Sequence, residues 1–111
     1  MERLIRLYEE FGQSPWLDNL QRGYLSSGRL VELRDDGVRG LTSNPTIFQK
    51  AIASSAEYDD QFRALSRDDG PVVDDYWTLV IADIEAACDV FDPVYDSSGG
   101  RDGFVSVEVA P

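Results

Sequence analysis

Four polar residues suited to proton transfer and hydrogen bonding lie at the ends of short apolar segments or inside them. Asp18 lies in the middle of the first segment, and Thr42 and Asn44 close the second. Glu108 lies within the third segment. A carboxylate can give or take a proton at a reacting group, and burial tunes its pKa for that task. The carboxylates therefore indicate general acid–base chemistry, although Asp18 and Asn44 could each cap a helix and Glu108 could lie on an exposed edge.

Short strands and helices alternate along the chain that carries these residues. Apolar residues at helical spacing predict an opening helix over 3–11, closed by Gly12. Strands are predicted at 16–20, 38–42 and 104–109. Helical segments are predicted after residue 18 up to 35, with Asp18 or Asn19 as a cap, after Asn44-Pro45, over 58–65 and over 73–91. Residues 92–103, rich in Asp, Ser and Gly, predict an exposed loop.

Strands separated by helical segments are typical of parallel α/β architecture. The carboxyl ends of parallel strands share one edge, where the ligand sites of such folds lie. The polar residues after the three strands are therefore expected to form one site. Three strands with no helix after the last one leave the sheet uncovered, so we interpret residues 1–111 as the first portion of a single larger domain that has been cut off.

Composition excludes several classes of chemistry. The 111 residues, 42% apolar, suffice for one modest core, and they contain no histidine, one cysteine (Cys88) and one lysine (Lys50). Ser-His-Asp and Cys-His nucleophiles, internal disulfides and His/Cys zinc clusters are thereby excluded for this chain. Cys88 is expected to be a small buried residue of the long helix. A net charge of −11, concentrated at −10 in residues 45–111, argues against nucleic-acid and membrane-surface binding.

Three motifs in the same order and with similar spacing resemble the first three strands of transaldolase. They are Trp16-Leu17-Asp18, the segment Gly40-Leu41-Thr42-Ser43-Asn44-Pro45-Thr46-Ile47-Phe48, and Ser106-Val107-Glu108-Val109. The resemblance covers nearly the whole chain, including a helix before the first strand. It implies a partial TIM-type (β/α)8 barrel, formed by its first three strand–helix steps after an N-terminal helix.

The resemblance also implies roles for the four polar residues. Asp18 matches the general acid/base of carbon–carbon cleavage, and Glu108 matches the glutamate that moves protons through a water during imine formation. Asn44 matches the asparagine that hydrogen-bonds the dihydroxyacetone unit, with Thr42 in a supporting role beside it. An amide suits a sugar-like substrate because it contacts hydroxyl groups without adding charge near a phosphate.

The implied activity is that of a cytoplasmic enzyme of the pentose phosphate pathway. It would transfer a dihydroxyacetone unit from a ketose phosphate such as fructose 6-phosphate to an aldose phosphate such as erythrose 4-phosphate, through a Schiff base, with no metal or organic cofactor. The family's Schiff-base lysine lies on strand four, and Lys50 does not match it. The 111 residues alone are therefore expected to be inactive.

Two further interpretations stand beside this one. The resemblance holds equally for a single-domain transaldolase and for one fused to a phosphoglucose isomerase domain, and it implies no particular oligomeric state. The second interpretation is a non-enzymatic interaction module derived from a partial barrel, which would dock onto a partner through its uncovered sheet edge.

Overall fold

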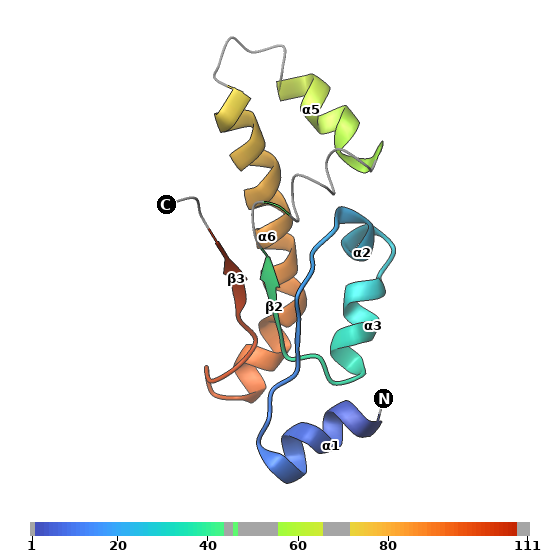
Figure 1. Ribbon diagram of the computed structural model, residues 1–111, viewed down its shortest axis with the longest axis vertical. Coiled ribbons are helices and arrows are strands. Elements are labelled where there is room, and N and C mark those ends of the chain that lie inside the picture. Colours follow the sequence, from blue (N-terminus) through green and yellow to red (C-terminus); the bar gives the residue numbers. More distant parts are fainter. Residues whose placement is uncertain (1, 44–45, 47–55, 66–71, 109–111) are drawn as a thin grey trace.

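The computed structural model describes residues 2–43, 46, 56–65 and 72–108. Helices and strands alternate as predicted over most of this part of the chain (Figure 1). In chain order the elements are α1 (Glu2–Phe11), β1 (Trp16–Leu17), α2 (Arg22–Ser26), α3 (Arg29–Asp35), β2 (Gly40–Ser43), the 3-10 helix η1 (Ala56–Tyr58), α5 (Asp59–Leu65), α6 (Val72–Ser97) and β3 (Val105–Val107). None of the helices in these segments has the length and apolar character needed to cross a bilayer.

The three strands form one parallel sheet in the order β1-β2-β3. Leu17 is paired with Leu41, and Thr42 with Ser106. The pairing continues past β3, where the backbone N–H of Glu108 donates to the carbonyl of Ser43 at 3.1 Å. Parallel strands in sequence order, joined through helices, confirm the α/β architecture and are consistent with the opening portion of a barrel.

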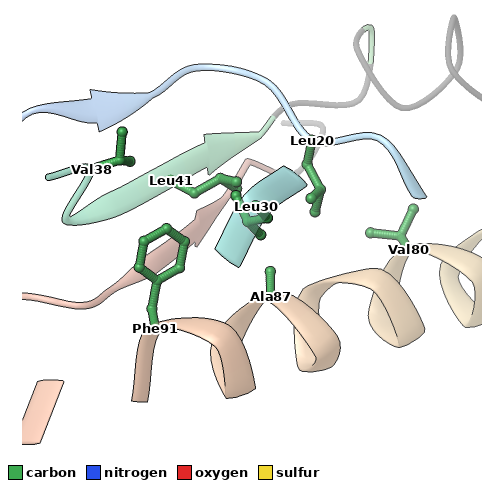
Figure 2. Packing of buried hydrophobic residues seen from close by; sticks show 7 residues of the cluster. All are labelled: Leu20, Leu30, Val38, Leu41, Val80, Ala87 and Phe91. Atoms are coloured by element: carbon green, nitrogen blue, oxygen red, sulfur yellow. The ribbon is translucent and has the colours of Figure 1, made fainter. Parts of the chain in front are cut away.

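One face of the sheet is covered by α6, with α2 and α3 completing the hydrophobic core. Figure 2 shows Ala87 and Phe91 pointing from α6 toward the sheet, where Leu41 of β2 belongs to the same cluster. Leu41, Ala87 and Phe91 are all fully buried. Because side chains alternate along a strand, Thr42 must project from the opposite face. Helix packing thus reserves one face for the core and leaves the other to polar residues.

The long helix extends further than its pattern predicts. The predicted loop over 92–103 is wrong for residues 92–97, since α6 runs through Pro93 to Ser97. Pro93 costs the helix one backbone donor, but it lies on the exposed side, where water can satisfy the freed carbonyl. Val94, one residue later, still packs against the core and supports the last turn. The helix ends at Ser97, shortly before Gly99 and Gly100, which both have positive φ.

Two other local predictions are wrong. No side chain caps α2, whose preceding residue is Gln21. Asp18 instead accepts a hydrogen bond from Thr42, and the Asn19 amide donates to the Tyr24 hydroxyl at 3.4 Å. Cys88 is exposed rather than buried, because α6 packs its neighbour Ala87 into the core and turns position 88 outward. The predicted helix start at Asn44 lies outside the described residues.

A buried ion pair connects the chain segments that lead into the strands, at the amino ends of the sheet. The Nε of Arg39, just before β2, donates to Oδ2 of Asp102, just before β3, at 2.6 Å. The Ser14 hydroxyl, which precedes β1, donates to the same oxygen at 2.6 Å. The Arg39 guanidinium also lies 3.5 Å from the ring centroid of Tyr8, which ties α1 to the sheet. All three strand entrances and the first helix therefore meet at one carboxylate.

The Asp102 carboxylate is held in its charged form. Burial opposes its ionisation, but the hydrogen bonds from Ser14 and Arg39, the charge of Arg39 and a hydrogen bond from Trp16 together lower the pKa of Asp102 below its ordinary value. A carboxyl whose pKa is lower in the folded state stabilises the fold above its unfolded pKa, and this stabilisation is lost as pH falls through the folded pKa.

We predict that Asp102→Asn lowers the free energy of unfolding at pH 7 by about 3–5 kcal/mol, since it breaks a buried ion pair and leaves Arg39 uncompensated. The difference from wild type should begin to shrink as pH falls below the ordinary pKa of an aspartate, about 4, and should disappear as pH falls through the lowered pKa of Asp102 in the folded protein. Urea unfolding at pH 7 and pH 3 measures both effects. Glu32→Gln, which breaks an exposed ion pair with Arg29, serves as the control and should cost at most about 1 kcal/mol. A difference for Asp102→Asn that stayed constant with pH would contradict this account.

We predict that Cys88 reacts slowly with thiol reagents at pH 8 despite its exposure. Desolvation raises the pKa of the Cys88 thiol, and the negative charges of Asp92, Asp89 and Glu85 raise it further, so little thiolate is present. Asp92→Asn should accelerate modification by dithionitrobenzoate several-fold, and added salt should accelerate the wild-type reaction. Asp35→Asn, which removes a charge from α3, is the control and should leave the rate unchanged.

Candidate active site

Asp18 and Thr42 meet on the face of the sheet that the helices leave uncovered. The Thr42 hydroxyl donates to Oδ1 of Asp18 at 2.5 Å, across the gap between the end of β1 and β2. The strand register explains why these two side chains are neighbours. Leu17 pairs with Leu41, and Asp18 and Thr42, each one residue later, project from the face opposite to these leucines. Thr42 thereby fixes one oxygen of a carboxylate that is exposed.

Glu108 lies at the same edge of the sheet, directly after β3. Its N–H donates to the Ser43 carbonyl, so its backbone position is set by β2. Alternation from Ser106, which pairs with Thr42, places Glu108 on the same face as Thr42. The structure thus brings Asp18, Thr42 and Glu108 to one edge and one face. Both carboxylates are exposed in this part of the chain.

Ser106 is a polar residue of this face that we did not single out from the sequence. It is paired with Thr42 in the sheet, and Thr42 in turn binds Asp18, so the three residues form one row across the strands. The signal was present in the sequence: Ser106 stands two residues before Glu108, which puts both on one face of a strand.

The remaining candidate, Asn44, lies outside the described residues, as does Lys50, which is not expected to be the Schiff-base lysine. Asn44 follows Ser43, the last residue of β2. Lys50 is the only lysine in the sequence. Segments 16–19, 40–43 and 105–108, which form the strands and their exits, contain no basic residue. Among the described residues no group of His, Cys, Asp and Glu side chains could hold a metal ion.

An indole ring forms the floor beneath this row of polar residues. Trp16 pairs with Gly40, and a Cβ at Gly40 would overlap the atoms of the Trp16 ring. Glycine is therefore required at position 40 because the ring lies flat across its backbone. Trp16 also donates a hydrogen bond toward Asp102, which connects the floor to the ion pair at the strand entrances. The polar row thus rests on an apolar layer one step closer to the amino ends of the strands.

Comparison with known proteins identifies relatives along nearly the whole chain. A sequence model of the family described as Transaldolase/Fructose-6-phosphate aldolase matches residues 15–111. The chain is 50% identical over 101 residues to a transaldolase of Thiobacillus denitrificans, covering 90% of this chain and 28% of the relative. It is 49% identical over 100 residues to a transaldolase of Neisseria meningitidis, with the same two shares, 90% and 28%.

A third relative gives the same result. A transaldolase of Trichodesmium erythraeum is 47% identical over 104 residues, which cover 93% of this chain and 27% of the relative. The chain therefore spans a little over a quarter of the length of the curated relatives it matches.

We predict that Asp18 and Thr42 are energetically coupled. A double-mutant cycle of Asp18→Ala and Thr42→Val, measured by urea unfolding, should give a coupling energy of about 1 kcal/mol. The value is expected to be modest because the hydrogen bond is exposed to water. Thr42→Ser retains the hydroxyl and is the matched control, with the coupling to Asp18 preserved. Additive effects of Asp18→Ala and Thr42→Val would show that the bond does not form in solution.

Proposed function

Because the chain belongs to the transaldolase/fructose-6-phosphate aldolase family, we propose that it supplies the first three strands, and part of the acid–base machinery, of a transaldolase barrel. The whole enzyme would transfer a dihydroxyacetone unit from a ketose phosphate of the fructose 6-phosphate class to an aldose phosphate of the erythrose 4-phosphate class. The observation that carries the proposal is the meeting of Asp18, Thr42 and Glu108 on one uncovered face, in a chain about half identical to named transaldolases.

In this proposal Asp18 is the general acid/base of carbon–carbon cleavage. Its position supports the role, since one oxygen is held by Thr42 and the exposed carboxylate can reach a hydroxyl group of the substrate. A fixed carboxylate loses little orientational freedom when it takes up a proton, which is the condition for efficient proton transfer. Thr42 is proposed to support substrate binding beside Asn44, and its hydroxyl also holds Asp18.

Glu108 is proposed to move protons through a water while the imine forms and hydrolyses. It stands beyond β3 on the same face as Asp18, so the two carboxylates can serve different atoms of one substrate. Asn44, next after β2, is proposed to bind hydroxyl groups of the dihydroxyacetone unit. An amide offers both donor and acceptor without titrating.

The amine for the Schiff base is proposed to come from strand four of the barrel, not from Lys50. Imine formation joins a lysine amine to the ketose carbonyl carbon and releases water, and each proton movement needs a nearby carboxylate. The absence of basic residues from 16–19, 40–43 and 105–108 is in keeping with a phosphate site and a lysine on other strands. The whole enzyme would act in the cytoplasm, in the pentose phosphate pathway, without metal or organic cofactor.

A chimaera tests the proposal directly. Residues 15–111 would replace the matching segment of the Thiobacillus denitrificans transaldolase, and turnover of fructose 6-phosphate with erythrose 4-phosphate would be measured in a coupled assay. We expect the chimaera to be active and Asp18→Asn and Glu108→Gln each to lower kcat by roughly 10²- to 10⁴-fold. Glu32→Gln on the far side of α3 is the control and should leave kcat unchanged. A folded chimaera whose kcat is insensitive to Asp18→Asn would refute the assignment.

We predict that the isolated 111-residue chain has no transaldolase activity, because the proposed nucleophile lies elsewhere. Incubation with fructose 6-phosphate and borohydride should add no dihydroxyacetone-derived mass, whereas the active chimaera should gain one such adduct on the lysine contributed by its partner segment. Intact-mass analysis measures both. An adduct on Lys50 of the isolated chain would overturn the prediction.

A further inference from the structure

A second buried carboxylate, Asp83, lies under the part of the chain that follows β1. It is 2% exposed and stands on α6 between the core residues Val80 and Ala87. The Nε of Arg22 donates to its Oδ1 at 2.8 Å, and the Tyr58 hydroxyl donates to its Oδ2 at 2.5 Å. Both oxygens are therefore bound, and the charge is compensated by a guanidinium.

The three residues join three separate parts of the chain. Arg22 begins α2, Tyr58 ends η1, and Asp83 belongs to α6. The backbone N–H of Arg22 also donates to the Tyr58 hydroxyl at 3.1 Å, and the guanidinium lies 4.3 Å from the centroid of the Tyr58 ring. A further hydrogen bond runs from the guanidinium to the Leu79 carbonyl at 3.4 Å. Arg22 is thus held by its backbone N–H, by its ion pair with Asp83 and by the contact of its guanidinium with the Tyr58 ring.

This cluster sets the path of the residues next to Asp18. Only three residues separate Asp18 from Arg22, and one of them, Leu20, is fully buried in the core. On its other side Asp18 follows Leu17, which is held in the sheet. The segment 18–22 is therefore anchored at both ends and in its middle, while the Asp18 carboxylate itself stays exposed.

We propose that Arg22, Asp83 and Tyr58 are positioning residues for Asp18. They hold the exit of β1 against α6, so that the Asp18 carboxylate reaches the substrate in one orientation. This inference rests on the proposed function and extends it to residues that do not touch the substrate. Small errors in the position of a reacting group cost catalytic rate rather than substrate binding.

The chain contains its own control for a purely structural role. Ser14, Arg39 and Asp102 repeat the same arrangement, a buried carboxylate bound by one guanidinium and one hydroxyl, at the edge where the strands begin. Removing the hydroxyl donor by Tyr58→Phe or by Ser14→Ala makes equivalent changes at the two edges. Tyr58→Phe acts on the segment that leads away from Asp18, whereas Ser14→Ala acts at the entrance of β1.

The experiment compares kcat and KM for both variants in the active chimaera with the Thiobacillus denitrificans transaldolase, its transplanted segment extended to include Ser14. We expect Tyr58→Phe to lower kcat by between about tenfold and a hundredfold with KM nearly unchanged, and Ser14→Ala to leave both values near those of wild type. Arg22→Lys, which keeps the charge but loses the flat guanidinium, should give an intermediate loss of kcat. Circular dichroism and urea unfolding establish that each protein is folded.

Three outcomes would overturn the inference. Equal kcat for folded Tyr58→Phe and Ser14→Ala would show that the Asp83 cluster only stabilises the fold. If Tyr58→Phe does not fold, a wild-type kcat for Arg22→Lys would lead to the same conclusion. A folded chimaera without substitutions that has no transaldolase activity would refute the proposed function itself, and the inference with it. That result is distinguishable because it appears before any substitution is made.

Discussion

The packing of α6 against one face of the sheet is the constraint on which the rest of the structure depends. Leu41 enters the core against Ala87 and Phe91, and this contact determines which way every other residue of β2 must face. A shift of one residue in register would bury Thr42 and expose Leu41. The polar row of Asp18, Thr42 and Ser106 is therefore a consequence of core packing as much as of the polar residues themselves.

Two buried Arg–Asp pairs complete this arrangement, one near the amino ends of the strands and one near the carboxyl end of β1. The pair of Arg39 and Asp102 gathers the strand entrances, and the pair of Arg22 and Asp83 holds the chain where it leaves β1. Burial and the hydrogen bond to Asp83 raise the pKa of Tyr58, with the Asp83 charge acting in the same direction, so its hydroxyl remains a donor. Both pairs lie close to the sheet.

Elements whose signals are local could be predicted from the sequence. The opening helix, the three strand positions and most of α6 follow from apolar spacing, and the three motifs indicated the family. The prediction of a loop at 92–97 was wrong because Val94 packs against the core and extends the helix. The prediction of a buried Cys88 was wrong because Ala87 takes the core-facing position. The buried ion pairs could not be predicted, since their partners are 61 and 63 residues apart and each residue alone looks like a surface charge. Ser106 could have been found from its spacing to Glu108.

The stacking of Trp16 on Gly40 has a consequence for how this sequence can change over generations. The two positions share one volume, so a side chain at position 40 becomes tolerable only after the indole has been replaced by something smaller. Loss of the indole would in turn remove a hydrogen-bond donor from Asp102. A substitution at position 40 is therefore blocked while Trp16 is present, and the viable mutational routes must pass through position 16 first.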